Sequence, residues 1–303
     1  MIIGTIIHPA FLTQVNLVNI LQQSSELSVL VLAEAIILIV GKFDLSLESI
    51  VGVAPMLAAY LVTDKTINGS GVMLNPYLAV LLLFAVGIAI GIFNGWLIVR
   101  LGLNAFIATL AMLILLRGVS IGLTNGRTLY GLPEPLLYLG NALWLGVPAS
   151  VWVSGGLFLV GSYILGYHRF GRALYAIGGN AEAARAAGVR VDQYVWTVFA
   201  IAGGLAALSG LMLTGRMASV LSGQGQGLIF TVFAAAVIGR ISLNGGKGSI
   251  LGALGGVILL GVISNILTLS NIETFWISAT YGAIILLSLI VARLTSGKSY
   301  RSD

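Results

Sequence analysis

The chain has 303 residues, of which 58% are hydrophobic and 8% are charged, with a formal net charge of +5. A soluble domain carries roughly 25% charged residues, so this composition excludes a water-soluble globular protein and indicates a membrane protein. The sequence contains no cysteine, which excludes disulfides and thiolate metal sites. The basic residues form no single stripe, so nucleic acid is not expected as a partner.

The first recognisable element is the segment Phe11–Ser25, FLTQVNLVNILQQSS. Its apolar and amide side chains separate onto two faces at helical spacing. This pattern is typical of an amphipathic helix, which we expect to lie at the membrane interface or against the bundle rather than to span.

Nine apolar segments follow and predict a polytopic helical bundle. A single helix through residues 27–63 would run about 55 Å, whereas the hydrocarbon core is about 30 Å thick. The GKFDLSLES interruption therefore predicts two short crossings, or a broken helix with a re-entrant turn. The fold class is all-α, a single transmembrane domain over 1–303 with broken or re-entrant segments. The segments are 27–40, 49–63, 78–99, 103–124, 150–167, 193–214, 228–241, 248–269 and 274–294.

The orientation follows from the basic residues. Four of the 15 Lys and Arg residues lie in or beside the polar loop 167–192, which is therefore predicted to be cytoplasmic. Alternation of crossings then puts Arg240 and Lys247 inside, and the 125–149 loop with Glu134 outside. An odd count of nine crossings puts the start of the chain outside.

Within the 167–192 loop, the sequence AEAARAAG predicts a short helix, because alanine favours helix. Asn180 is the expected N-cap and Gly188 the expected stop. Glu182 and Arg185 are expected to pair at i,i+3 spacing. From these residues alone, a partner-docking element and a solvated linker helix are equally good interpretations.

Several chemistries lack the residues they need. GGKGS (Gly245–Ser249) resembles a phosphate loop, but a Walker A motif needs Gly and Ser or Thr where this chain has Ile241 and Gly248. His8 and His168 are far apart without acidic company, so no metal site is expected. No catalytic constellation is visible. We expect no catalytic residue, metal or cofactor in this chain.

Longer stretches resemble one family in order along the chain. They are NLVNILQQSS, GKFDLSLESI, NAFIATLAMLILLRGVSIGLTNG, RFGRALYAIGGNAEAARAAGV, SLNGGKGSILGALGGVILLGVISNILTL and FWISATYGAIILLSL. The chain resembles permease subunits of ribose/xylose/galactose-type ATP-binding-cassette (ABC) importers. Family members usually carry one further helix before this region, ten spans in all. Here the GKFDLSLES segment adds Lys42 and Glu48, and Lys42 is expected to pair with Asp44 or Glu48.

The resemblance implies a multi-pass protein of the bacterial inner membrane that carries a simple sugar or polyol. It implies two ABC ATPase subunits in the cytoplasm, an extracytoplasmic solute-binding protein, and a second permease copy or paralogue, all in membrane lipid. ATP hydrolysis would belong to the partners. The coupling residues would be Gly171, Arg172, Asn180, Glu182, Arg185 and Gly188.

Candidate residues for the translocation path are polar groups in or near the spans. Glu34 lies within an apolar run, where a charge is costly unless paired or hydrated. Asp44 lies in the helix break, and a helix cap is its main alternative role. Amides offer weak donors and acceptors to sugar hydroxyls, or hydrogen bonds between helices; the candidates are Asn94, Asn104 and Asn125.

Other classes of transporter and enzyme remain open. An ABC permease for amino acids or other small polar solutes is a more distant relative. A stand-alone secondary transporter would need intramembrane coupling carboxylates or an inverted repeat. An integral-membrane enzyme would need a catalytic cluster at one interface.

Overall fold

The computed structural model describes residues 4–5 and 8–295, and most of them are in helices. Two short antiparallel strand pairs connect helices, with Leu129 opposite Val220 and Leu143 opposite Pro148. The helices are η1 (Pro9–Leu12), α2 (Gln14–Ile39), α3 (Leu47–Val62), η2 (Lys65–Ile67), α4 (Pro76–Val99), α5 (Ala105–Thr124), α6 (Glu134–Asn141), α7 (Ala149–Tyr167), α8 (Arg169–Gly179), α9 (Ala181–Ala186), α10 (Val191–Met217), α11 (Leu228–Ile238), α12 (Ile250–Leu269) and α13 (Thr274–Thr295). The strands are β1 (Leu129–Tyr130), β2 (Leu143–Trp144), β3 (Val147–Pro148) and β4 (Ser219–Val220).

All nine predicted apolar segments are helical, which confirms the all-α membrane fold class. Among the described residues, six helices are long and apolar enough to cross a membrane, while α3 and α11 are shorter apolar helices. Local chemistry sets several boundaries: Asn75, Asn104 and Ser249 each accept a hydrogen bond from the first turn of the helix they precede. The number of crossings stays a prediction.

The prediction for Phe11–Ser25 was wrong in one respect. From Gln14 onward this segment is the first part of a continuous 26-residue helix, α2, rather than a separate interfacial helix. The stretch QQSSELS contains no Gly or Pro to break the helix. Its polar groups find partners inside the bundle: Ser28 Oγ lies 2.6 Å from Ser154 Oγ on α7. Because these buried polar side chains have hydrogen-bond partners, the polar stretch can continue as part of a buried helix.

Glycines let helix backbones approach closely at two crossings. A Cβ at Gly91 of α4 would lie 2.1 Å from the Phe199 carbonyl oxygen of α10, and one at Gly256 of α12 would lie 2.2 Å from the Ala235 carbonyl oxygen of α11. Such strips of small residues are typical of helix packing in membranes. Gly91 and Gly256 therefore have a structural role inside one subunit.

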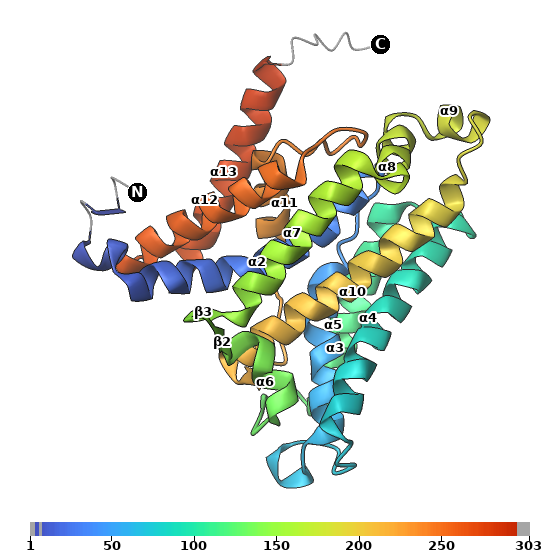
Figure 1. The fold of residues 1–303 in the computed structure, drawn as a ribbon. Helices are drawn as coiled ribbons and strands as arrows, with labels where there is room; N and C mark the ends of the chain where they lie inside the picture. Colours follow the sequence, from blue (N-terminus) through green and yellow to red (C-terminus); the bar gives the residue numbers. More distant parts are fainter. Residues whose placement is uncertain (1–3, 6–7, 296–303) are drawn as a thin grey trace.

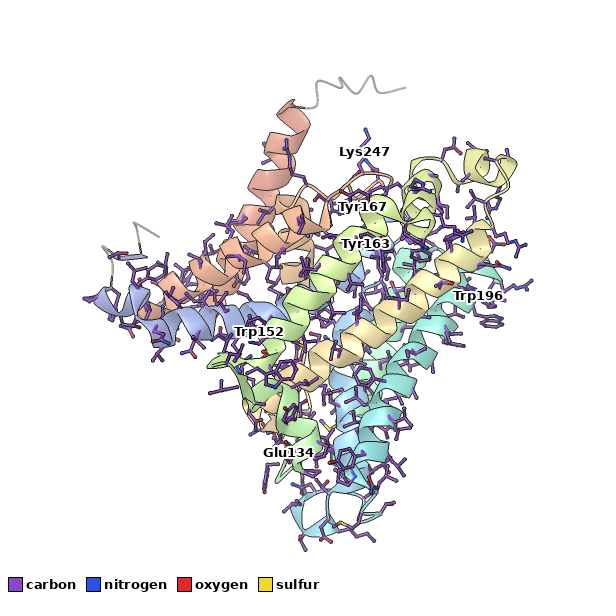
Figure 2. All side chains as sticks on the ribbon, viewed as in Figure 1. Glu134, Trp152, Tyr163, Tyr167, Trp196 and Lys247 are labelled. Atoms are coloured by element: carbon purple, nitrogen blue, oxygen red, sulfur yellow. The ribbon has the colours of Figure 1, made fainter. Side chains whose placement is uncertain are left out.

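Loops that the charge pattern predicts on opposite sides of the membrane lie at opposite ends of the molecule. Glu134 of α6 and Lys247, in the loop before α12, lie at opposite ends (Figure 2). α2 runs crosswise past α7 and α10, and α8 and α9 project at one end of the bundle (Figure 1). The last residue of α2 lies at the Lys247 end, because the Gly246 N–H donates to the Ile39 carbonyl oxygen at 2.9 Å.

Candidate functional site

The α8–α9 segment is a pair of short helices with explicit caps. His168 Nδ1 accepts from the Phe170 N–H at 3.2 Å, and Asn180 Oδ1 accepts from the Ala183 N–H at 3.0 Å. Gly188 adopts φ +83°, a left-handed conformation that favours glycine. Its neighbour Val189 donates to the Ala184 carbonyl oxygen at 3.0 Å, which closes the end of α9. The predicted cap and stop are confirmed.

The predicted pair of Glu182 and Arg185 was wrong. Arg185 Nη2 lies 2.9 Å from Asp192 Oδ1 instead. Asp192 is in the first turn of α10, where a carboxylate is favoured by the helix dipole. Glu182 is exposed and has no ion pair among residues 4–5 and 8–295. The outer side of α8–α9 therefore presents Glu182 and Arg172 to the surroundings.

The inner side of α8 is fixed to the bundle by backbone contacts. A Cβ at Gly178 would lie 1.9 Å from the Ile39 carbonyl oxygen and 2.4 Å from the Gly246 nitrogen. Tyr175 Oη donates to the Gly248 carbonyl oxygen at 2.9 Å. Burial raises the pKa of the Tyr175 hydroxyl, which therefore stays a neutral donor at physiological pH. α8 is thus attached to the end of α2 and to the loop that leads into α12.

Gly171 and Arg172 hold the start of α8 against α7. A Cβ at Gly171 would lie 2.4 Å from the Leu165 Cα, and Arg172 Nη1 donates to the Tyr167 carbonyl oxygen at 3.0 Å. Both residues therefore have a positioning role inside this chain. A displacement of α8–α9 would be passed to α7, α2 and α12 through these contacts.

Removal of the α9 cap should loosen this segment. Replacing Asn180 by Ala removes the acceptor for the Ala183 N–H, which costs a helix about 1 kcal/mol. We expect faster hydrogen exchange over Ala181–Ala186 and, if the segment docks on an ATPase as the resemblance implies, lower ATPase stimulation, with the bundle unchanged. Asn75→Ala is the matched control, since Asn75 caps α4 through the Tyr77 N–H at 2.9 Å. Equal coupling in both variants would contradict the prediction.

A buried polar cluster lies where the chain leaves α2. Glu34, Asp44 and Asn94 are each 0% exposed. Asp44 Oδ1 accepts from Ser46 N–H at 2.9 Å and from Ser46 Oγ at 2.6 Å, and Asn94 Nδ2 donates to Ser46 Oγ at 2.7 Å. The Asp44 N–H donates to Glu34 Oε1 at 3.4 Å. Asp44 therefore turns the chain ahead of α3, but the N-cap of α3 is Ser46, so the predicted role of Asp44 as the helix cap was wrong.

This cluster has unused hydrogen-bonding capacity. Glu34 Oε2 and Asn94 Oδ1 are buried without a partner among the described residues. A buried polar atom without a partner is costly, so it favours a ligand, a proton or a water at that point. A path role for Glu34, Asp44 and Asn94 stays a prediction.

Asn104 and Asn125 are not part of this cluster. They lie at opposite ends of α5 and both are exposed. Asn104 Oδ1 accepts from the Ile107 N–H at 3.2 Å, and Asn125 ends the helix with φ +51°. Each has a capping role, and a path role for these two residues stays a prediction.

The expected ion pair of Lys42 was wrong. Among the described residues Lys42 forms no ion pair, and Glu48 pairs with Arg117 of α5. The second oxygen of Glu48 accepts from the Ile229 N–H at 3.1 Å, in the first turn of α11. One carboxylate therefore joins α3, α5 and α11, with the favourable sign for a helix N-terminus.

Two further polar groups were missed by the sequence analysis. Arg216 Nε donates to Glu26 Oε1 at 2.7 Å, and this pair joins α10 to α2. Gln224 is buried, and its Nε2 lies 3.0 Å from the Val51 carbonyl oxygen and 3.1 Å from Thr214 Oγ1. The sequence signal for these residues was a charge or an amide within a long apolar stretch. Their partners could not be identified from one sequence, because Glu26 and Arg216, for example, are 190 residues apart.

Glu34 gives a testable case. Glu34→Gln keeps size and hydrogen bonding, whereas Glu34→Leu removes the acceptor for the Asp44 N–H. If Glu34 lines the path, Gln should change uptake by about tenfold, equivalent to about 1.4 kcal/mol, at unchanged thermal stability. Uptake and melting temperature are measured for both variants at equal expression. Unchanged uptake in both would reject a path role.

The chain is similar to known permeases over most of its length. Residues 16–292 match the family described as branched-chain amino acid transport system / permease component. The chain belongs to this family. It is 36% identical over 287 residues to the ribose import permease protein RbsC of Escherichia coli K12, covering 93% of this chain and 87% of that protein. It is 33% identical over 282 residues to the L-arabinose ABC transporter permease protein AraH of Azospirillum brasilense, covering 93% and 81%.

A third relative widens the range of named solutes. The autoinducer 2 import system permease protein LsrC of Salmonella choleraesuis is 32% identical over 280 residues, covering 91% of this chain and 77% of that protein. No solved structure matches this chain. The chain is therefore a multi-pass membrane permease, the transport component of an ABC importer, and not itself an enzyme.

Proposed function

We propose that the chain is the permease subunit of a binding-protein-dependent ABC importer in a bacterial inner membrane. It would form the translocation path and assemble with ABC ATPases, a solute-binding protein and a second permease copy or paralogue. ATP would be bound by the partners, with no cofactor in this chain. The topology would be about nine spans, with α8–α9 in the cytoplasm.

The observation that carries this proposal is the anchoring of α8–α9. An exposed, capped helix pair is attached through Gly178 and Tyr175 to the end of α2 and to the loop before α12. A rigid element of this kind transmits a push from a cytoplasmic motor. A solvated linker would not need backbone packing so close that a Cβ at Gly178 would lie 1.9 Å from the Ile39 carbonyl oxygen.

We further propose a simple sugar or similar polyol as the solute. The names of the three relatives refer to ribose, L-arabinose and autoinducer 2. An amino-acid importer is the second candidate, favoured by the description of the family.

Cross-linking tests the coupling role. The chain has no cysteine, so a single cysteine can be introduced at Ala183 in α9 or at Leu145 between β2 and β3. In the complex with its ATPase, we expect Ala183→Cys to form cross-links that change with ATP and Leu145→Cys to form none. Cross-linking of the ATPase to Leu145→Cys alone would contradict the proposal.

A further inference from the structure

An arginine-lined cavity lies at the end of the bundle that carries α8 and α9. Its volume is about 540 Å³. The walls come from the last residues of α4, from the end of α9 and the turn that follows it, and from the first turns of α10. The charged residues of the lining are Arg100, Arg185, Arg190 and Asp192. The cavity is separate from the Glu34 cluster and from the contacts that fix α8 to α2.

Positive charge is in excess in this cavity. Arg185 pairs with Asp192, so these two charges compensate each other. Arg100 and Arg190 are exposed, and neither forms an ion pair among the residues that the structure describes. Two guanidinium groups are therefore free to bind an anion. A guanidinium matches the geometry of a phosphate group, to which it can donate paired hydrogen bonds.

An aromatic ring positions one of these arginines. The guanidinium carbon of Arg100 lies 5.9 Å from the centroid of the Trp196 ring, within the range of a cation–π interaction. The Trp196 ring packs on α4, since a Cβ at Gly95 would lie 3.1 Å from Trp196 Cδ1. Trp196 lies at the outer edge of the bundle, near the end that carries α8 and α9 (Figure 2). Tryptophan and arginine side chains at the edge of a membrane protein are typical of the level of the lipid headgroups.

The surface of α4 next to the cavity is apolar. Ile92 and Trp96 precede Arg100 by eight and four residues, so the three side chains share one face of the helix. Ile92 is 46% exposed and Trp96 is 40% exposed. The ring of Phe93, 45% exposed, stacks on Trp96 with the centroids 5.9 Å apart. An occupant that fits both surfaces carries an anionic group for the arginines and hydrocarbon for α4, which an acidic protein segment lacks.

We infer that this cavity binds the phosphate headgroup of an anionic phospholipid from the cytoplasmic leaflet. Arg100 and Arg190 contact the phosphate, and the acyl chains lie along the exposed face of α4. The leaflet follows from the charge pattern, which puts α8 and α9 on the cytoplasmic side. Basic pockets at this level of a membrane protein suit anionic headgroups. The bound lipid joins the end of α4 to the start of α10, and its binding does not depend on which solute is carried.

The test uses the purified full-length permease in a neutral detergent. Melting temperature is measured as dioleoylphosphatidylglycerol or dioleoylphosphatidylcholine is added, which gives an apparent affinity for each lipid. The variants are Arg100→Gln and Arg190→Gln. The matched control is Arg169→Gln, because Arg169 is an exposed arginine at the start of α8, outside the lining of this cavity. Loss of one basic contact should lower the affinity for phosphatidylglycerol about fivefold.

The control separates a site from a diffuse surface charge. We expect both cavity variants to lose affinity for phosphatidylglycerol and Arg169→Gln to keep it, while phosphatidylcholine affects all four proteins alike. An equal loss in Arg169→Gln would overturn the inference, as would unchanged affinity in both cavity variants. Melting temperatures without added lipid show whether each variant is folded.

Two further measurements exclude other occupants. If inorganic phosphate raises the melting temperature of the natural chain as much as phosphatidylglycerol does, the site takes a free anion and the lipid assignment is wrong. If Arg100→Gln or Arg190→Gln changes the number of permease copies in the detergent particle, a second copy covers this surface and the assignment is also wrong. No ATPase, binding protein or solute is present, so the proposed function does not depend on any of these results.

Discussion

Adding a single methyl group at Gly178 is expected to uncouple ATP hydrolysis from transport. The new Cβ would lie 1.9 Å from the Ile39 carbonyl oxygen and 2.4 Å from the Gly246 nitrogen, so α8 must move away from the bundle. Backbone atoms on both sides cannot yield as a flexible side chain would. We expect Gly178→Ala to lower the ratio of solute uptake to ATP hydrolysis by about tenfold or more, while membrane insertion is retained.

The neighbouring glycine provides the control. Gly179 lies in the same helix, and a Cβ there meets nothing within 4 Å. Gly179→Ala should leave coupling unchanged and, if anything, stabilise α8, because alanine favours helix over glycine. Coupling is measured as the ratio of solute uptake to ATP hydrolysis in proteoliposomes. Two variants with equal, normal ratios would show that the α8 contact with α2 is not part of the transmission.

The largest effect on stability is expected at Glu48. Its carboxylate pairs with Arg117 and accepts from the Ile229 N–H, so Glu48→Met leaves a cation and a buried N–H without partners. Breaking a buried pair costs about 3–5 kcal/mol, and the partial exposure of Arg117 favours the lower end of that range. We expect a lower melting temperature for the purified permease.

A double variant distinguishes the unpaired charge from the lost packing. Glu48→Met with Arg117→Met removes both charges and should recover a large part of the loss, because the uncompensated cation is gone. The exposed pair Arg185–Asp192 is the reference, and Asp192→Ala should cost less than about 1 kcal/mol. A double variant less stable than Glu48→Met would refute this explanation.

Local chemistry was the part of the fold that the sequence predicted well. Asn180 and Gly188 have the predicted roles because a cap and a left-handed stop depend on a few adjacent residues. The nine apolar segments were found for the same reason, since hydrophobic length is a local property. At the break after α2 the contact is also local, since Ser46 Oγ donates to Asp44 Oδ1, although Ser46 and not Asp44 is the N-cap of α3.

Contacts between residues far apart in the chain could not be predicted from one sequence. Lys42 and Glu182 were each paired with a neighbour, whereas Glu48 pairs with Arg117 at a separation of 69 residues. The continuity of α2 depends on partners such as Ser154, 126 residues beyond Ser28. The arginine-lined cavity was missed because its lining comes from three separate helices. Tertiary packing decides which residues pair and where a helix continues, and it overrides what the local spacing of residues favours.

The energy source of uptake tests the account most directly. Proteoliposomes contain this permease with its ATPase, and the solute-binding protein and a labelled monosaccharide are added outside. We predict uptake that requires ATP inside and the binding protein outside, and that does not respond to a proton or sodium gradient. Uptake driven by an ion gradient in the permease alone, without ATP or the ATPase, would contradict the account.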